Sequence, residues 1–169
     1  MDEVQNEKKT SIKQFIKDLH YNDMRLHLYP DQVLRNNTDY VTAFDSDLHW
    51  LATRMFEAMR LYGGIGLAAP QIGLSTKIVA VDIEGMHNFL INPEIQSYAL
   101  ESEIKAEGCL SIPGHTFDID RSLKIEVMAN DLAGKELHFE ANGFTARVIQ
   151  HEINHLNGVL ICDNNVENR

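Results

Sequence analysis

The stretch Gln150-His151-Glu152-Ile153-Asn154-His155, close to the C-terminus, decides how the rest of the chain is interpreted. Residues four apart lie on one face of an α-helix, so His151 and His155 can both reach one metal ion. Glu152 can then face a water on that metal. The stretch predicts a metal-binding helix. The alternative is an ordinary amphipathic helix with solvated histidines, and a third ligand elsewhere in the chain would decide between the two.

A catalytic site of this kind needs three protein ligands and one open position. The candidates for the third ligand are Cys109, Cys162, His20, His27, His49, His87, His115 and His138. The histidines stand singly, and solvated or core histidines are commoner than ligands. Cys162 follows an apolar run and is expected to pack as a small hydrophobe. Cys109, in a tight segment with the polar residues Glu107 and Ser111, is the favoured third ligand.

Size and charge indicate a single globular domain and argue against some classes of binding partner. The chain has 169 residues, 44% of them hydrophobic, which suits one domain with a core. Its 15 basic and 25 acidic side chains give a net charge of −10, which argues against partners that are nucleic acids or anionic membranes. No apolar run is long enough to span a bilayer, and the N-terminal stretch lacks the apolar segment of a signal peptide. We therefore expect a cytoplasmic protein with free thiols.

Apolar periodicity predicts a helix that begins at a cap on Asp45 or Ser46 and ends at Gly63-Gly64. Asn142 is expected to cap a second helix over about 143–157, which Gly158 closes. Strands are expected at 77–83, 89–92, 95–98, 102–106, 123–127 and 136–141, with Pro93 at the end of the second and the last two forming a hairpin. The expected fold is α+β, with short mixed, mostly antiparallel sheets packed around a C-terminal metal-binding helix.

Three stretches resemble the signature motifs of the peptide deformylase family, and they occur in the family's order. They are GIGLAAPQ at 64–71, EGCLS at 107–111 and QHEINH at 150–155. The similarity extends from Tyr29 to Leu160, or about three-quarters of the chain. It implies a metal-dependent hydrolase that removes the formyl group from the N-terminal formylmethionine of nascent polypeptides and releases formate.

The resemblance also implies residue roles. Cys109, His151 and His155 correspond to the family's metal ligands. Glu152 corresponds to the general base, which takes a proton from water and passes it to the leaving amine. The metal implied is ferrous iron, which zinc, nickel or cobalt can replace.

Further correspondences concern the substrate, an N-formylmethionyl peptide. Gln71 and the main-chain N–H of Leu110 correspond to the donors to the formyl oxygen. Gly66 lies where the family pairs its backbone with the peptide. Ile65 and Phe144, near the motifs in sequence, are candidates for a methionine pocket, with ordinary core positions as the alternative.

The resemblance implies a single peptide deformylase catalytic domain over residues 25–169. Residues 1–24 are additional to it and carry a weak helical pattern, which fits either a docked helix or a loose arm. Eleven residues follow Gly158, so docking to the ribosome through a long C-terminal extension is not expected.

One motif residue departs from the family pattern, because Asn154 stands where an acidic residue is usual. Asparagine keeps the hydrogen bonding and loses a charge that could orient a nearby arginine. Arg121 matches an arginine that the family keeps near the second motif, and it either braces that loop or is exposed.

Two other interpretations of the metal motif are a zinc endopeptidase and a binding protein without activity. A zinc endopeptidase would place its third ligand after the helix, whereas Cys109 lies before it. A binding protein without activity would keep the metal and turn over no formylpeptide.

Overall fold

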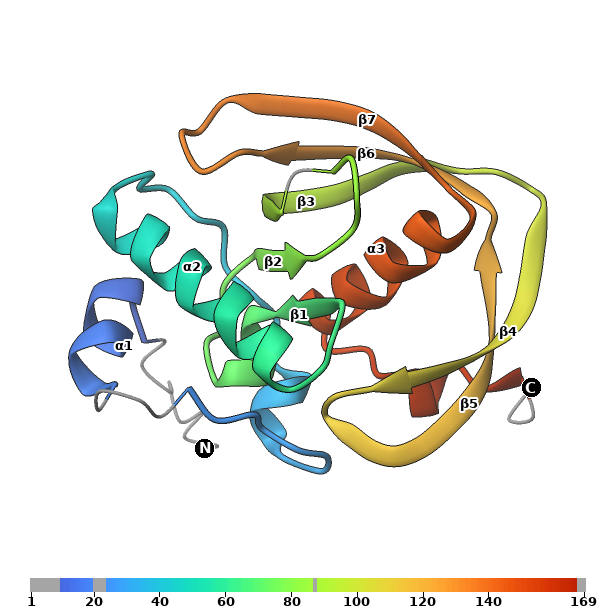
Figure 1. Ribbon diagram of the computed structural model, residues 1–169, viewed down its shortest axis with the longest axis horizontal. Helices are drawn as coiled ribbons and strands as arrows, with labels where there is room; N and C mark the ends of the chain where they lie inside the picture. Colours follow the sequence, from blue (N-terminus) through green and yellow to red (C-terminus); the bar gives the residue numbers. More distant parts are fainter. Residues whose placement is uncertain (1–9, 20–23, 87, 167–169) are drawn as a thin grey trace, which may run out of the picture.

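A computed structural model of the chain describes residues 10–19, 24–86 and 88–166. They form two antiparallel sheets and three α-helices (Figure 1), so the expected α+β class is confirmed. The helices are α1 (Ile12–Asp18), α2 (Ser46–Leu61) and α3 (Gly143–Leu156), with short 3-10 helices η1 (Gln32–Arg35), η2 (Ala69–Ile72) and η3 (Ile161–Asp163). The larger sheet has the order β1 (Gly66–Ala68), β2 (Ile78–Val81), β3 (Phe89–Tyr98), β6 (Lys124–Asn130) and β7 (Glu136–Asn142). The smaller sheet pairs β4 (Ser102–Cys109) with β5 (Ile112–Ser122).

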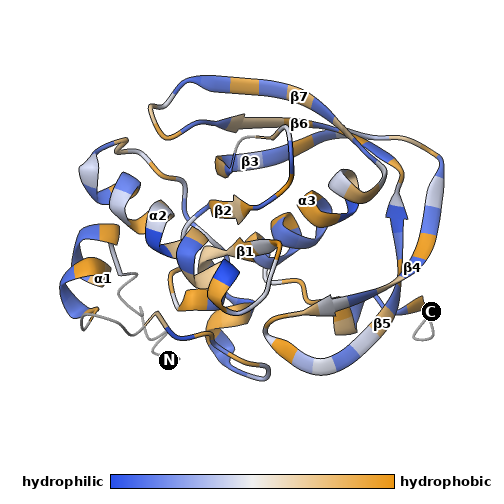
Figure 2. Cartoon of the chain, in the orientation of Figure 1, coloured by the Kyte–Doolittle hydropathy of each residue, from blue (hydrophilic) through white to orange (hydrophobic). Residues whose placement is uncertain are grey.

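The larger sheet is buried on both faces in its first two strands, β1 and β2, because α2 packs on one side and α3 on the other. Successive side chains of a strand point to opposite faces. Ile78 and Ala80 of β2 join the core cluster of α2, and Val79 and Val81 join the cluster of α3. This explains the continuous hydrophobic character of β2, whereas the outer strand β7 alternates (Figure 2). The helix with the metal motif is thereby held against a rigid sheet.

The ends of α2 follow the sequence prediction. The Asp45 carboxylate accepts from the main-chain N–H groups of Asp47 and Leu48, and Gly63 takes a positive φ of 73° after the last turn. Helix α3 begins where the sequence predicts, but the expected capping bond from Asn142 is wrong. Asn142 stands at the capping position but makes no capping bond, and its side-chain nitrogen donates to Glu140 Oε1 at 2.9 Å. Gly158 closes α3 as predicted, with a φ of 69°.

The predicted end of a strand at Pro93 was wrong, because β3 is continuous through this proline. The register with β6 shifts between Ile91 and Glu94, and Asn92 has a φ of 52°. A bulge of this kind tolerates proline, which has no N–H to give to the ladder. The Asn92 amide replaces the lost ladder contacts by bonding both main-chain groups of Val41.

The hairpin of β4 and β5 is longer than the sequence suggests. β4 extends beyond the expected 102–106 to Cys109, and β5, over 112–122, was not expected. Much of this hairpin is exposed, and its second strand contains Pro113, Gly114 and two aspartates, which disfavour strand predictions. Its formation depends on pairing along the full length of β4. The hairpin runs beside α3 (Figure 1), and the end of β4 places Cys109 close to the motif histidines.

The described part of the N-terminal segment contains α1, which Ser11 caps. Its apolar side chains Ile12, Phe15 and Ile16 pack against the core cluster that includes α2. Residues 1–9 and 20–23, together with two of the candidate ligands, His20 and His87, lie outside the described residues. Among the helices that the structure describes, none is both long and apolar enough to cross a membrane.

Candidate metal centre

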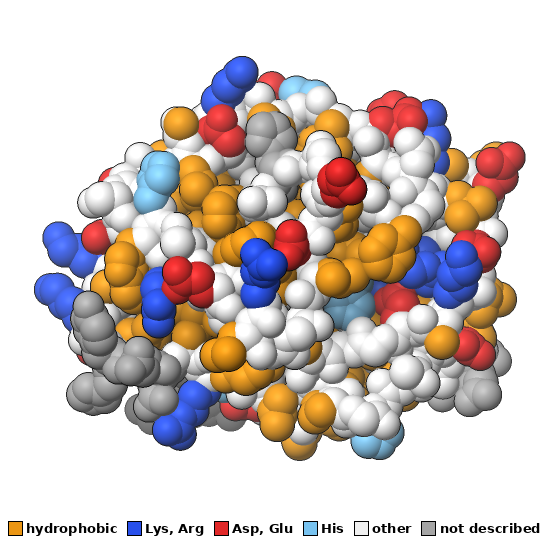
Figure 3. All heavy atoms as spheres, in the orientation of Figure 1, with side chains coloured by type: hydrophobic (Ala, Val, Ile, Leu, Met, Phe, Trp, Pro, Cys, Tyr) orange, Lys and Arg blue, Asp and Glu red, His pale blue; other side chains and the backbone are white. Residues whose placement is uncertain are grey.

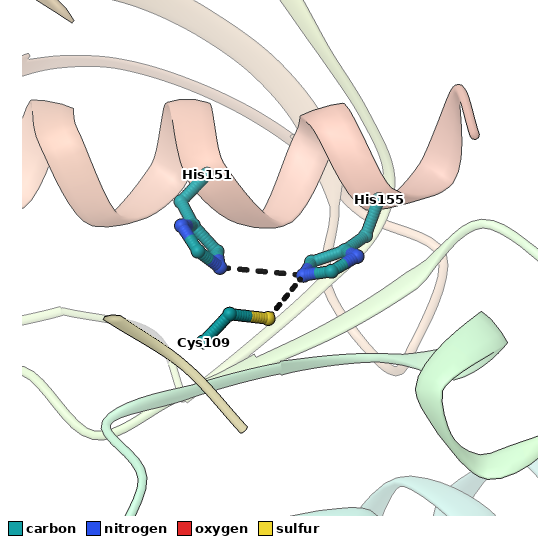
Figure 4. A group of neighbouring side chains, drawn as sticks. All are labelled: Cys109, His151 and His155. Atoms are coloured by element: carbon teal, nitrogen blue, oxygen red, sulfur yellow. Dashed lines mark hydrogen bonds between the residues drawn. The ribbon is translucent and has the colours of Figure 1, made fainter. Parts of the chain in front are cut away.

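The two motif histidines of α3 and the cysteine at the end of β4 point toward one another (Figure 4). His151 Nε2 lies 3.3 Å from His155 Nε2, and Cys109 Sγ lies 3.3 Å from His155 Nε2. All three ligand atoms lie within 4.8 Å of one another. Tetrahedral zinc-like geometry requires separations of roughly 3.3 Å between nitrogens and roughly 3.6 Å between sulfur and nitrogen. The three side chains therefore fit a transition-metal ion.

The other candidate ligands within the described residues do not join this group. His27 bonds Asp31, His49 bonds the main chain of Asp45, and His138 bonds Glu136. Cys162 packs beside Leu160 and Ile161, as the sequence predicts. A set of one thiolate and two imidazoles favours zinc or iron over calcium or magnesium, which prefer oxygen ligands.

Glu107 orients His151 from behind. Its Oε2 lies 3.0 Å from His151 Nδ1, which leaves Nε2 to face the metal position. Arg121 donates to both carboxylate oxygens, at 3.0 and 2.9 Å, and Arg147 donates to Oε1 at 2.8 Å. Burial by itself would raise the pKa of Glu107, but the bonds with His151 and Arg121 lower that pKa to about 2. Glu107 is therefore a permanent anion beside the ligand.

Asn154, the departure from the family motif, takes part in the same network. With its amide oxygen turned toward Arg121, that oxygen accepts from Arg121 Nη1 at 3.1 Å, and the amide nitrogen donates to the Gln150 carbonyl at 2.9 Å. Arg121 is buried, so it braces the hairpin against α3, and the exposed alternative is wrong. A neutral asparagine thus provides the hydrogen bond that Arg121 needs without adding a second anion.

Glu152 is buried beside the ligands, and its Oε2 has no hydrogen-bond partner among the described residues. Burial raises the pKa of its carboxyl to about 7. Gly66 lies directly against it, since a Cβ added to this glycine would stand 2.2 Å from Glu152 Oε1. Glycine is therefore required at position 66 by the close approach of the carboxylate.

Gln71 enters the site from η2 with its amide held at both ends. Its Oε1 accepts from the Ala68 main-chain N–H at 2.9 Å, and its Nε2 donates to Ser111 Oγ at 3.1 Å. The same Nε2 lies 3.7 Å from Cys109 Sγ. The donor end of Gln71 is thus fixed close to the metal position. Leu110 lies at the turn between β4 and β5, next to Cys109.

The chain is similar in sequence to a family of known proteins, and this similarity identifies the site. Residues 23–169 match the sequence profile of the family described as polypeptide deformylase. This chain belongs to that family.

Individual relatives agree with the family assignment. The peptide deformylase of Thermotoga maritima is 43% identical over 139 residues, which cover 82% of this chain and 85% of that protein. The crystal structure of a Thermotoga maritima peptide deformylase superposes with a TM-score of 0.81 at 42% identity and covers 83% of this chain and 96% of that one. A peptide deformylase from Synechococcus elongatus in complex with actinonin gives 0.81 at 40% identity, covering 86% and 80% of the two chains.

A cavity of about 430 Å³ opens beside the ligands of this deformylase-family centre. Ile65, Gly66 and Phe144 line it together with Gln71, Leu110 and Glu152. Ile65 and Phe144 are 43% and 64% exposed, so neither is an ordinary core residue. Figure 3 shows hydrophobic side chains beside a hollow in which a histidine and an acidic side chain are visible.

Arg147, which was not among the predicted site residues, lines the same cavity. This arginine is buried and bonds Glu107 and the main-chain carbonyl of Ile119. It stands four residues before His151, on the same face of α3, and that spacing could have identified it.

Proposed function

We propose that this member of the deformylase family hydrolyses the formyl group of N-terminal formylmethionine with Glu152, Gln71 and Leu110 as its catalytic groups. The observation that carries the proposal is the buried carboxylate of Glu152, whose Oε2 has no hydrogen-bond partner among the described residues. It lines one cavity together with Gln71 and the candidate ligands Cys109 and His151. The products are formate and a free amino terminus.

Cys109, His151 and His155 would hold one divalent ion, for which we propose ferrous iron as the native metal and zinc, nickel or cobalt as substitutes. When bound, such an ion lowers the pKa of water and stabilises negative charge on a carbonyl oxygen. Burial lowers the pKa of His155 well below its usual range, which keeps this imidazole in the neutral form that binds metals.

Glu152 would move the proton. Its carboxylate takes a proton from the attacking water, and the resulting acid returns it to the nitrogen of the leaving amine. A pKa of about 7, raised by burial, allows both transfers near neutral pH. The contact with Gly66 confines this carboxylate to the cavity wall beside the ligands.

Gln71 and Leu110 would stabilise the formyl oxygen as it gains negative charge. Nε2 of Gln71 and the main-chain N–H of Leu110 are the proposed donors, and each such donor contributes roughly 3 kcal/mol to the transition state. The amide of Gln71 is oriented before substrate arrives, because Ala68 and Ser111 hold its two ends.

The cavity would take the formylmethionyl end of the peptide. Ile65 and Phe144 provide apolar surface for the methionine side chain. Gly66 lies on β1, which pairs with β2 on one side and is the outer strand of the described sheet, so its other edge is the proposed place for the peptide backbone. We propose that the enzyme acts in the cytoplasm on nascent chains, without contacts to nucleic acid or membrane.

Formate release from formyl-Met-Ala-Ser tests the proposal. The protein is loaded anaerobically with iron or nickel, and Glu152→Ala serves as the control. We expect formate from the wild type at more than about 100 times the rate of the variant, because a positioned general base contributes about 100-fold or more. No formate above the control would refute the proposal. Actinonin, which is bound in the relative from Synechococcus elongatus, is expected to inhibit the reaction.

A further inference from the structure

Ser111 is the most deeply buried polar side chain near the proposed oxyanion donors, and no catalytic or metal-binding role accounts for it. It is 0% exposed and lies in the short connection between β4 and β5. Its hydroxyl oxygen accepts a hydrogen bond from Gln71 Nε2 at 3.1 Å, across 40 positions of sequence. The contact joins the second sequence motif to the first.

This bond and the bond at the other end of the amide together fix the direction of the Gln71 side chain. The Gln71 Oε1 is already engaged with the Ala68 N–H, so the NH2 group must face the side of Ser111 and Cys109. An amide nitrogen has two hydrogens at a fixed angle. One is directed at Ser111 Oγ, and the other points toward Cys109 Sγ, 3.7 Å from Nε2, and so toward the metal position.

The main chains of the two residues are tied together as well. The N–H of His27 donates to the Gln71 carbonyl at 2.7 Å, and the N–H of Tyr29 donates to the Ser111 carbonyl at 2.8 Å. One short segment, 27–29, therefore spans both loops and fixes the distance between Gln71 and Ser111. The hydroxyl is a stationary acceptor that does not follow the amide if the amide rotates.

We propose that Ser111 is a positioning residue for the reaction, whose hydroxyl holds Gln71 Nε2 in the direction that the formyl oxyanion requires. The proposal rests on the proposed role of Gln71. It places Ser111 outside direct contact with substrate and gives the buried hydroxyl an effect on the transition state. Removing it leaves one hydrogen of the buried amide without its acceptor and takes away one of the contacts that hold the amide in this direction.

A double-mutant cycle on the metal-loaded enzyme tests this. We expect Ser111→Ala to lower kcat about tenfold with little change in KM, and Gln71→Ala to lower it roughly 100-fold. Because Ser111 acts through Gln71, Ser111→Ala in the Gln71→Ala background should cost nothing further. An equal loss in both backgrounds, or no loss in the wild type, would overturn the proposal.

Two controls separate positioning from general damage. Ser122→Ala removes a hydroxyl that bonds the carbonyls of Ala99 and Lys124, away from the cavity, and should leave kcat within about twofold. Metal content and thermal unfolding of each variant show whether Cys109 keeps its ion. If Ser111→Ala does not fold, Ser111→Cys retains the size with a weaker acceptor, and a wild-type kcat in that variant contradicts the proposal.

A wild-type enzyme that releases no formate refutes the proposed function itself. A wild-type enzyme that is active, with an unaffected Ser111→Ala variant, refutes only the role of Ser111.

Discussion

At the scale of single residues, the site depends on close approach between groups that lie far apart in the sequence. Glu152 and Gly66 are the clearest case, because the carboxylate occupies the space that a side chain at position 66 would fill. Since both positions lie within the family's motifs, the glycine of the first motif is explained by the glutamate of the third.

Gly66→Ala should therefore inactivate the enzyme through Glu152. The new Cβ would meet Oε1, Cδ and Cγ of this glutamate at 2.2, 2.7 and 2.9 Å, so the carboxylate must leave its place. We expect kcat to fall by roughly 100-fold or more, which is the contribution of a positioned general base. Steady-state kinetics on formyl-Met-Ala-Ser measures this effect.

The double variant Gly66→Ala/Glu152→Ala provides the check. With the glutamate shortened, the alanine at position 66 has room, so the double variant should be as active as Glu152→Ala alone. A further loss of activity in the double variant would mean that Gly66 acts through the β1 backbone rather than through Glu152.

At the scale of elements, the β4–β5 hairpin and α3 are joined through a buried group of charges. Glu107 of β4 contacts Arg121 of β5 and both Arg147 and His151 of α3. One anion thus faces two permanent cations, and removing it would leave two buried guanidinium groups without their counter-charge.

Glu107→Gln is expected to lower the free energy of unfolding by about 3–5 kcal/mol, as breaking a buried ion pair does. It should also weaken metal binding by about 10- to 100-fold, because His151 loses the anion that orients it. Urea unfolding and metal titration measure the two effects. Glu103→Gln is the matched control: it lies at a partly exposed site four positions before Glu107 on β4, its carboxylate pairs with Lys105, and the change should alter stability by less than about 0.5 kcal/mol. Equal stability of the two variants would contradict this account.

Much of the site was predictable from the sequence, because its ligands lie in short local patterns. The spacing of His151 and His155 placed two ligands on one helix face, and the tight segment around Cys109 indicated the third. Arg147 and the bond between Ser111 and Gln71 were missed because they depend on which elements meet.

The helices and most strands were predictable for the same reason, because short local patterns of apolar residues define them. The continuation of β3 through Pro93 could not be predicted in this way, because it depends on the amide of Asn92 bonding Val41, some fifty positions earlier. Strand β5 was missed because its exposed residues follow no strand pattern and it forms by pairing with β4. These failures share one cause, which is that contacts distant in sequence override local preference.

At the scale of the whole molecule, the segment after α3 is held against the N-terminal third of the chain. Arg35, the last residue of η1, donates to the Gly158 carbonyl and pairs with the Asp163 carboxylate of η3. Gly158 also packs against the Arg35 main chain, so close that a Cβ would stand 2.5 Å from its carbonyl oxygen. These contacts stabilise the end of the helix that carries His155.

Asp163→Asn should lower stability in a way that depends on pH. The bond with Arg35 lowers the pKa of Asp163, so the charged pair contributes above the ordinary pKa of an aspartate and is lost as pH falls through the lowered value. Both side chains are about one-third exposed, at 32% and 38%, and solvent screening limits the effect to about 0.5–1 kcal/mol. The comparison isolates charge, since asparagine can still accept from the Leu160 N–H that Asp163 now engages. Urea unfolding of both proteins should therefore show a constant difference from about pH 7 to pH 5 that shrinks below about pH 4. A difference that grows with acidity would mean that Asp163 stabilises the fold in its protonated form, and the ion pair with Arg35 would then not be what holds the C-terminal segment in place.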